Sequence, residues 1–124
     1  MKHQLSYCEV EQLSDNIFEK TPKEGVVVDK NCLDECWSFW NNLTKKPFGL
    51  LVNWKNQFSF SFEGSRDIGK YSLIQKTAIL INESDHHSKK QLSLALQVKK
   101  MNGHYYNHKV FTDREEAINW LSCV

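Results

Sequence analysis

The sequence predicts an α/β domain with a partly parallel sheet, and three features of the chain favour this fold class. Segments rich in β-branched and aromatic residues alternate with segments of helical periodicity, which is typical of α/β layers. The apolar run at 48–54 predicts a central strand buried on both faces of a sheet. Near the C-terminus, a strand end at Val110 and Phe111 leads directly into a helix-start signal.

The N-terminal segment is expected to form two strands and a short extended stretch. Leu5, Tyr7 and Val10 predict the first strand, and the turn-prone residues 14–16 separate it from a second strand at 17–20. Residues 21–25, which include a proline and a glycine, predict a loop. The valines that follow at 26–28 predict a short strand or an extended lead-in to a helix.

A helix is predicted next, from a cap at Asp29 or Asn31 to about residue 43. Pro47 cannot continue a helix, so the chain must leave it before that position. Helical spacing places one set of apolar residues on a shared face, and its members are Leu33, Trp37, Trp40 and Leu43 or Thr44.

The middle of the chain contains two clear strands with an ambiguous segment between them. The strands are the apolar runs at 48–54 and 77–81. Between them, Phe58, Phe60 and Phe62 alternate with serines, as in a strand, and residues 63–71 predict a short helix that its glycines weaken.

The C-terminal part is expected to contain two helices separated by a strand. Ser88 and Gln91 match a capping box that would open a helix to about residue 101, and residues 104–111 predict the last strand. Thr112 and Glu115 match a second capping box, which would start the terminal helix.

Length and composition describe one soluble domain, residues 1–124. The formal net charge of +1 shows no basic footprint, so we expect no nucleic-acid partner. The first residues lack the apolar run of a signal peptide, and no segment approaches the roughly 18 apolar residues that span a bilayer. We therefore expect a cytoplasmic protein whose four cysteines stay reduced.

Four stretches carry a family resemblance that extends over nearly the whole chain. They are the two-strand start, the lead-in Gly25-Val26-Val27-Val28-Asp29, the strand at 46–53 and the terminal segment 110–121. In this order they resemble the small bacterial STAS-like domains, relatives of anti-sigma-factor antagonists that are also grouped with CRAL-TRIO lipid-transfer proteins. The resemblance implies a mixed sheet of about five strands, with helices packed mainly on one side, and a domain that binds rather than catalyses.

The chain departs from the resemblance at the regulatory motif. Antagonists of this type carry Asp-Ser-Ser-Gly, with a phosphorylated serine, at the start of the helix after the central strand. The corresponding stretch here is Ser61-Phe62-Glu63-Gly64, in which the glycine matches and Glu63 takes the phosphoserine position. Glu63 is either an ordinary first-turn acid or a permanent partial mimic of phosphate charge. Ser61 and Glu63 are the candidate switch positions.

Cysteine and histidine residues offer candidate metal or acid–base groups, each with a structural alternative. Cys32 and Cys36 share a helix face and match half of a metal site, but buried apolar filling explains them better. The remaining candidates are favoured as solvated or edge-strand histidines, and they are His86, His87, His104 and His108. We therefore predict no metal site.

Aromatic residues form two candidate binding surfaces. On the first helix they lie on more than one face, so one set could form a partner or dimer interface, and a core on both sides is the alternative. The residues of this candidate interface are Trp37, Phe39 and Trp40. Those of a candidate apolar pocket, for which core packing is the alternative, are Phe58, Phe60 and Phe62.

No phosphate loop, nucleophile elbow or paired metal motif is present in the sequence. We therefore expect a non-enzymatic module without a cofactor. The first hypothesis is a regulatory or protein-interaction domain that works as a homodimer or with a protein partner. The alternative is a carrier of a small apolar ligand, held between the sheet and residues 58–73.

Overall fold

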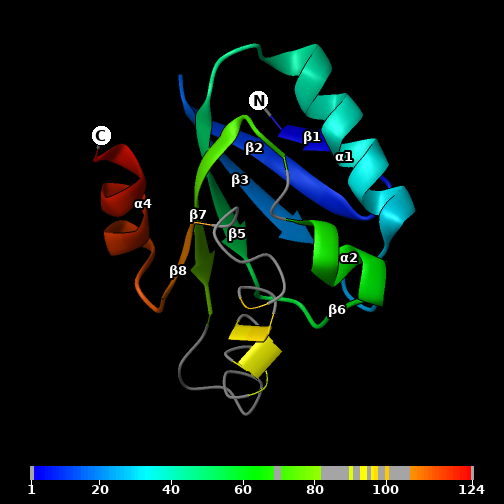
Figure 1. The fold of residues 1–124 in the computed structure, drawn as a ribbon. Helices are drawn as coiled ribbons and strands as arrows, with labels where there is room; N and C mark the ends of the chain where they lie inside the picture. Colours follow the sequence, from blue (N-terminus) through cyan, green and yellow to red (C-terminus); the bar gives the residue numbers. More distant parts are fainter. Residues whose placement is uncertain are drawn as a thin grey trace.

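A six-stranded mixed sheet forms the centre of the protein (Figure 1). The computed structural model describes residues 2–68, 71–81 and 107–123, together with isolated positions between 90 and 100. The first three strands in the sheet pair antiparallel, and the remaining neighbours pair parallel. In spatial order the strands are β1 (Lys2–Gln4), β2 (Cys8–Ser14), β3 (Ile17–Pro22), β5 (Phe48–Asn53), β7 (Ile74–Leu80) and β8 (His108–Phe111).

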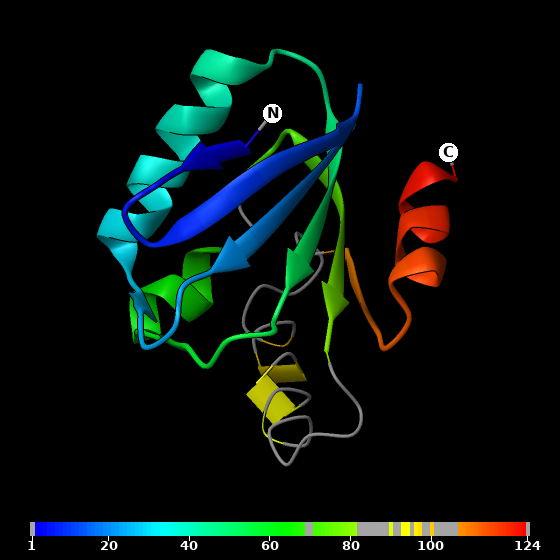
Figure 2. The same cartoon turned by 180° about the vertical axis from the view of Figure 1, so that it is seen from behind.

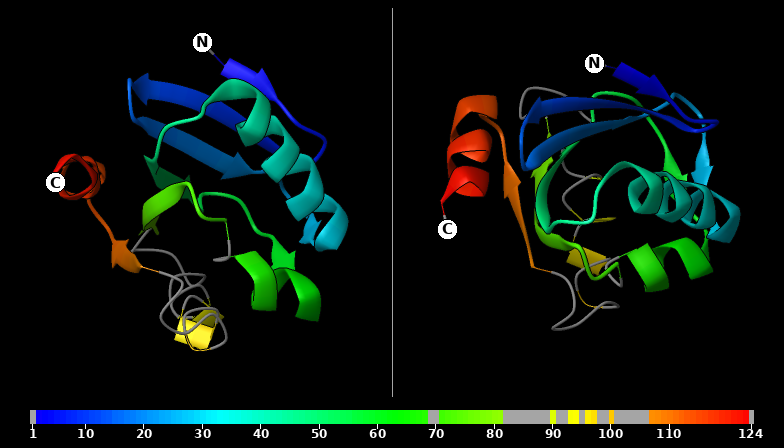
Figure 3. Two further views of the ribbon diagram at one scale, coloured as in Figure 1. Left: turned by 45° about the horizontal axis from the view of Figure 1, so that its top comes forward. Right: turned by 90° about the horizontal axis from the view of Figure 1, so that it is seen from above.

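Helices lie on both faces of this sheet (Figures 2 and 3). Helix α1 (Lys30–Leu43) and the short helix α2 (Phe62–Asp67) lie on one face, and α4 (Arg114–Ser122) lies on the other. The mixed α/β fold predicted from the sequence is confirmed, with six strands where about five were expected. No helix in the described part of the chain is long and apolar enough to cross a membrane.

Strand β5 is buried on both faces, as its apolar run predicts. Side chains alternate across a strand, so β5 contributes to two separate cores. Phe48, Leu50 and Val52 pack beneath α1, and Leu51 packs beneath α4. Gly49 also faces α4, and an added Cβ would press on Leu121.

Helix α1 begins at one of the two predicted caps. The side chain of Asp29 accepts a hydrogen bond from the backbone N–H of Cys32 at 3.0 Å, which satisfies a donor that has no partner within the helix. The fully buried face of the helix consists of Leu33, Cys36 and Trp40. It therefore differs from the predicted face, because Trp37 lies at its edge and is only half-buried.

A second, two-stranded parallel sheet contains the strand that precedes α2 in the chain. It pairs β4 (Val27–Val28) with β6 (Ser59–Phe60). Ser61 then caps α2 by accepting a hydrogen bond from the N–H of Gly64 at 3.0 Å. A Cβ at Gly64 would collide with the carbonyl oxygen of Val28. The close approach of α2 to β4 therefore requires glycine at this position.

Some of the predicted boundaries are wrong. The first predicted strand is two strands, β1 and β2, joined by a turn, because the chain reverses between them. The predicted box of Ser88 and Gln91 lies outside the described residues, as do His86, His87 and His104.

The predicted capping box of Thr112 and Glu115 is also wrong. Helix α4 begins one residue later than expected, with Asp113 as its cap, and the Asp113 carboxylate accepts a hydrogen bond from the N–H of Glu115 at 3.0 Å. Glu115 is therefore too close to the cap to complete a box with Thr112. Threonine and aspartate both favour this position, and the structure has the aspartate there.

Replacing Asp113 with alanine should lower the free energy of unfolding by about 1 kcal/mol, because the N-cap hydrogen bond is lost. Urea denaturation followed by circular dichroism would measure the change. The matched control is Thr112→Ala, which removes the neighbouring cap former and should leave stability within about 0.5 kcal/mol. A larger loss from Thr112→Ala than from Asp113→Ala would contradict the observed cap.

Candidate functional site

A narrow cleft separates α1 and α2 from the sheet and contains a void of about 30 Å³. A void needs roughly 10–15 Å³ to hold a water molecule, so this one has room for about two. Its walls are mostly apolar and aromatic, and Lys20, Thr77 and Asn107 are the polar residues among them. The lining residues are Lys20, Leu33, Cys36, Trp37, Trp40, Leu50, Val52, Ile68, Ile74, Thr77 and Asn107.

A second void of about 10 Å³ lies next to the first, and both are lined by Lys20, Val52 and Ile68. Phe58 and Phe60 line it, with their rings 5.5 Å apart. The structure therefore brings two of the three predicted pocket phenylalanines to an apolar void. A role in binding stays a prediction for both.

Phe62, the third predicted pocket residue, lies elsewhere and is 69% exposed. The prediction extended the two-residue period of a strand through position 62. Helix α2 begins at that residue, so the period changes to 3.6 and the ring points away from the voids. Arg66 lies over the Phe62 ring, 5.7 Å from its centre.

Lys20 is the one charged residue among those that line the two voids. It is only 4% exposed. Its ammonium donates a hydrogen bond to the hydroxyl of Tyr7 at 3.1 Å and lies 4.0 Å from the Sγ atom of Cys36. Within the described part of the chain, no carboxylate forms an ion pair with Lys20. The contacts of this buried ammonium are therefore a hydroxyl oxygen and a sulfur atom.

Two ionisable groups near Lys20, those of Tyr7 and Cys8, do not supply a negative charge to pair with its ammonium. Burial, reinforced by the nearby thiols of Cys36 and Cys8, raises the pKa of Tyr7 far above its ordinary value. Burial also raises the pKa of Cys8 to about 12, although the Lys20 ammonium acts in the opposite direction. At neutral pH the phenol of Tyr7 and the thiol of Cys8 are therefore uncharged.

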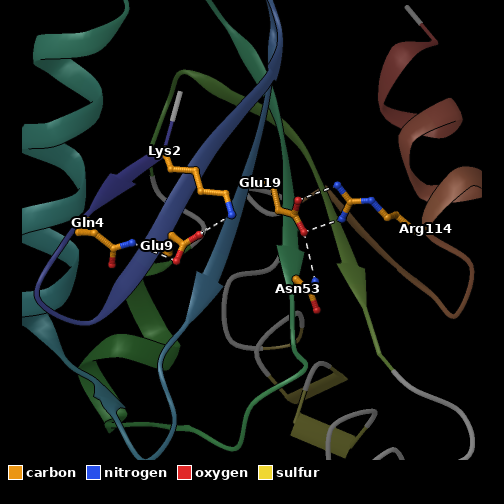
Figure 4. A network of polar contacts seen from close by, with 6 residues as sticks. All are labelled: Lys2, Gln4, Glu9, Glu19, Asn53 and Arg114. Atoms are coloured by element: carbon orange, nitrogen blue, oxygen red, sulfur yellow. Dashed lines mark hydrogen bonds and ion pairs between the residues drawn. The ribbon is translucent and has the colours of Figure 1, made fainter.

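The opposite face of the sheet carries a polar network (Figure 4). Arg114 of α4 donates two hydrogen bonds to the Glu19 carboxylate, at 2.6 and 2.7 Å, and Asn53 donates a third at 3.1 Å. Burial alone would raise the pKa of Glu19, but these donors outweigh it and hold that pKa below its ordinary value. The network ties the start of α4 to the centre of the sheet.

This polar face extends to the first two strands. Glu9 accepts a hydrogen bond from Gln4 at 3.0 Å and pairs with Lys2 at 3.3 Å (Figure 4). An open hollow of about 100 Å³ lies over this face. Charges of both signs line it and several are already paired, so it offers less to a ligand than the apolar cleft.

The predicted interface residues of α1 belong to the core or its edge. Trp40 is 1% exposed and packs against Phe18 and Phe48, with ring centres 5.1 and 4.7 Å away. It is therefore too deeply buried to contribute to a partner surface in this chain. Trp37 stacks on Tyr71, and Phe39 packs on the core beneath α1. Both are half-buried, and an interface role for them stays a prediction.

The two candidate switch positions begin α2. Ser61 is half-buried and its hydroxyl caps the helix, whereas Glu63 is exposed in the first turn. The structure therefore places the acid where a helix dipole favours negative charge. Mimicry of a phosphoserine by Glu63 stays a prediction.

Cys32, Cys36 and His108 do not form a metal-binding group. Cys36 is buried and Cys32 is half-buried, and both thiols are free. His108 is buried on β8 opposite Thr77 of β7. Over the residues that the structure describes, no group of three or more His, Cys, Asp or Glu side chains is placed to hold a metal ion.

Lys20, Glu19, Asn53 and Arg114 were missed as candidates by the sequence reasoning. A signal for the first two is present in the sequence. Glu19 and Lys20 are adjacent charged residues in a strand that begins Ile17-Phe18. Their side chains must therefore face opposite sides of the sheet. If both faces are covered, both charges are buried, which is uncommon for Lys and Glu without a partner.

Comparison with known proteins identifies the fold. No protein-family model matches the sequence, and no curated protein matches it significantly. The structure is similar to the crystal structure of an uncharacterized protein of the DUF3478 family, with a SpoIIAA-like fold, from Shewanella loihica PV-4. The two have a TM-score of 0.56 and 16% sequence identity, and the match covers 98% of each chain. The STAS-like fold implied by the sequence resemblance is thus confirmed.

Replacing Glu19 with glutamine should lower the free energy of unfolding at pH 7 by about 1–2 kcal/mol. The expected loss is less than for a fully buried ion pair, because solvent screens Arg114, which is 44% exposed. The pKa of Glu19 is depressed in the folded state, so its contribution is complete above the unfolded value of about 4.3 and is lost as pH falls through the folded value. The variant should therefore lose less stability than the wild type on acidification.

Urea unfolding at intervals from pH 7 to pH 3 would test this expectation. The matched control is Asp15→Asn, a change of one negative charge in the exposed turn between β2 and β3. It should keep the wild-type dependence on pH. An identical acid slope in wild type and Glu19→Gln would show that the network does not stabilise the fold.

Proposed function

We propose that this protein is a non-enzymatic binding module that holds a small, largely apolar ligand in the cleft between α1, α2 and the sheet. The observation that carries the proposal is the pair of adjoining voids, whose walls include several aromatic side chains and one buried cation. Ligand sites in proteins are typically apolar hollows with a few polar groups that orient the ligand. The cleft has this chemistry.

Binding requires the cleft to widen. Voids of about 30 and 10 Å³ are far smaller than the roughly 300–1,000 Å³ typical of ligand sites. The wall at the end of α2, where Ile68 lies, belongs to a small unit, because α2 has six residues and the β4–β6 ladder pairs only two residues of each strand. Small elements with few buried contacts open at low cost. Outward movement of α2 with β6 would enlarge both voids, because Ile68 follows α2 and lines each of them.

A regulatory or protein-interaction role is the second candidate. It is favoured by the exposed ring of Phe62, which lies between Ser61 and Glu63 on the first turn of α2. Exposed aromatic side chains are enriched at protein interfaces. The burial of Trp40 removes one of the three residues on which the sequence-based hypothesis of an α1 interface rests.

The wild-type protein should bind decanol or decanoate, with a change in tryptophan fluorescence, because Trp37, Trp40 and Trp54 line the two voids. Isothermal titration calorimetry would give the affinity. Replacing Ile68 with tryptophan should fill the cleft and weaken binding at least tenfold.

The matched control is Phe62→Trp, an aromatic exchange on the same helix at a position that faces away from the cleft. It should bind as the wild type does. Equal binding by Ile68→Trp and wild type, with both folded by circular dichroism, would place the ligand elsewhere. If neither probe binds to the wild type, the ligand-binding proposal is wrong and the interaction role takes precedence.

A further inference from the structure

We propose that Lys20 makes the cleft selective for ligands that carry a single negative charge, such as a carboxylate at the end of an apolar body. This inference rests on the proposed ligand-binding function and specifies the ligand class. It starts from a contrast between two neighbouring residues of β3. Glu19 and Lys20 are both buried, but among the residues that the structure describes only Glu19 has an ion-pair partner.

The contrast follows from the alternation of side chains along the strand. Glu19 faces α4, where Arg114 and Asn53 donate three hydrogen bonds to its carboxylate. Lys20 faces α1, where its partners are the Tyr7 hydroxyl and the Cys36 thiol. Burying an ion without a counter-charge is costly. The energetic cost at Lys20 would be offset by an anion that enters the cleft.

The hydrogen-bond donors of the Lys20 ammonium also favour an anionic ligand. A lysine ammonium has three N–H donors. One donates to Tyr7 at 3.1 Å, and the contact to Cys36 at 4.0 Å is at the limit for a bond to sulfur. The void of about 30 Å³ lies beside this group, so an acceptor atom of a ligand can reach the ammonium from that side.

Two ionisable groups near the ammonium, those of Tyr7 and Cys8, remain neutral and do not compete with such a ligand. Burial keeps the phenol of Tyr7 and the thiol of Cys8 protonated at neutral pH. The phenol is then a hydrogen-bonding partner and orients the ammonium without neutralising it. A carboxylate would add the strong, charge-assisted hydrogen bond that these groups lack.

The other lining residues limit the charge and shape of the ligand. Lys20 is the one cationic side chain among the described residues that line the voids. One cation in apolar surroundings suits a monoanion better than a phosphate dianion, which would leave charge uncompensated. The two voids adjoin at Lys20 and share Val52 and Ile68 as walls. An apolar body that extends from the anionic group along either void would therefore contact aliphatic and aromatic side chains.

The test compares decanoate with decanol, which have the same chain length and differ in charge. Calorimetric titration of the wild-type protein at pH 7.5 should show at least tenfold tighter binding of decanoate. Lys20→Met keeps the length of the side chain and removes the charge. It should weaken decanoate binding at least tenfold and abolish the preference for decanoate over decanol. The control Lys55→Met removes a positive charge from the opposite face of the sheet and should preserve the preference.

The outcomes separate this inference from the proposed function. Equal affinity of the wild type for both probes, or a preference that survives in Lys20→Met, would overturn the role of Lys20 while the apolar site stands. Binding of neither probe would overturn both proposals. The comparison of probes on the wild type needs no variant, so it decides the question even if Lys20→Met does not fold.

Discussion

Burial of β5 on both faces is the constraint on which the rest of this structure depends. Every second side chain of the central strands must fit a core beneath α1, and the others must fit a different core beneath α4. The requirement explains why Trp40 is buried against Phe18 and Phe48. It also explains why Gly49 lies where the side chain of Leu121 approaches the sheet.

The same constraint decides how the protein treats its buried charges. Glu19 and Lys20 are consecutive on β3 and are buried on opposite faces. The acid is neutralised by Arg114, a residue 95 positions away that begins α4. The ammonium lies in the cleft between α1, α2 and the sheet, beside the neutral phenol of Tyr7. Among the described residues, the carboxylate on one face of the sheet is therefore paired, whereas the ammonium on the other face has no ion-pair partner. That difference is the physical basis of the binding site that we propose.

The SpoIIAA-like fold positions this cleft, but a fold alone does not assign a function. The chain departs from the antagonist motif at Glu63, and its α2 is capped by Ser61 through a hydrogen bond to Gly64. The fold requires glycine at position 64, because an added Cβ would collide with the carbonyl oxygen of Val28. The glycine shared with the regulatory motif is thus explained by packing. The functional argument rests on the chemistry of the cleft, where aromatic walls surround Lys20.

The sequence by itself determined the fold class, the central strand and the approximate starts of α1 and α4, because each depends on local periodicity or on hydrogen bonding within one helical turn. It left the cap of α1 open between Asp29 and Asn31, and the structure shows Asp29. It misplaced Phe62, since the change from strand to helix at that residue depends on packing against β4. It predicted an apolar pocket beside residues 58–73 but did not identify Lys20 or the part that α1 has in the walls of the cleft. The antiparallel pairing of β2 with β3 brings Tyr7 to Lys20. Ile68, which is distant from both in sequence, joins Lys20 in the lining of the voids only through tertiary packing. Whether a charge in a strand is solvated, paired or left without a counter-charge is decided by the elements that cover each face, and tertiary structure alone sets that arrangement.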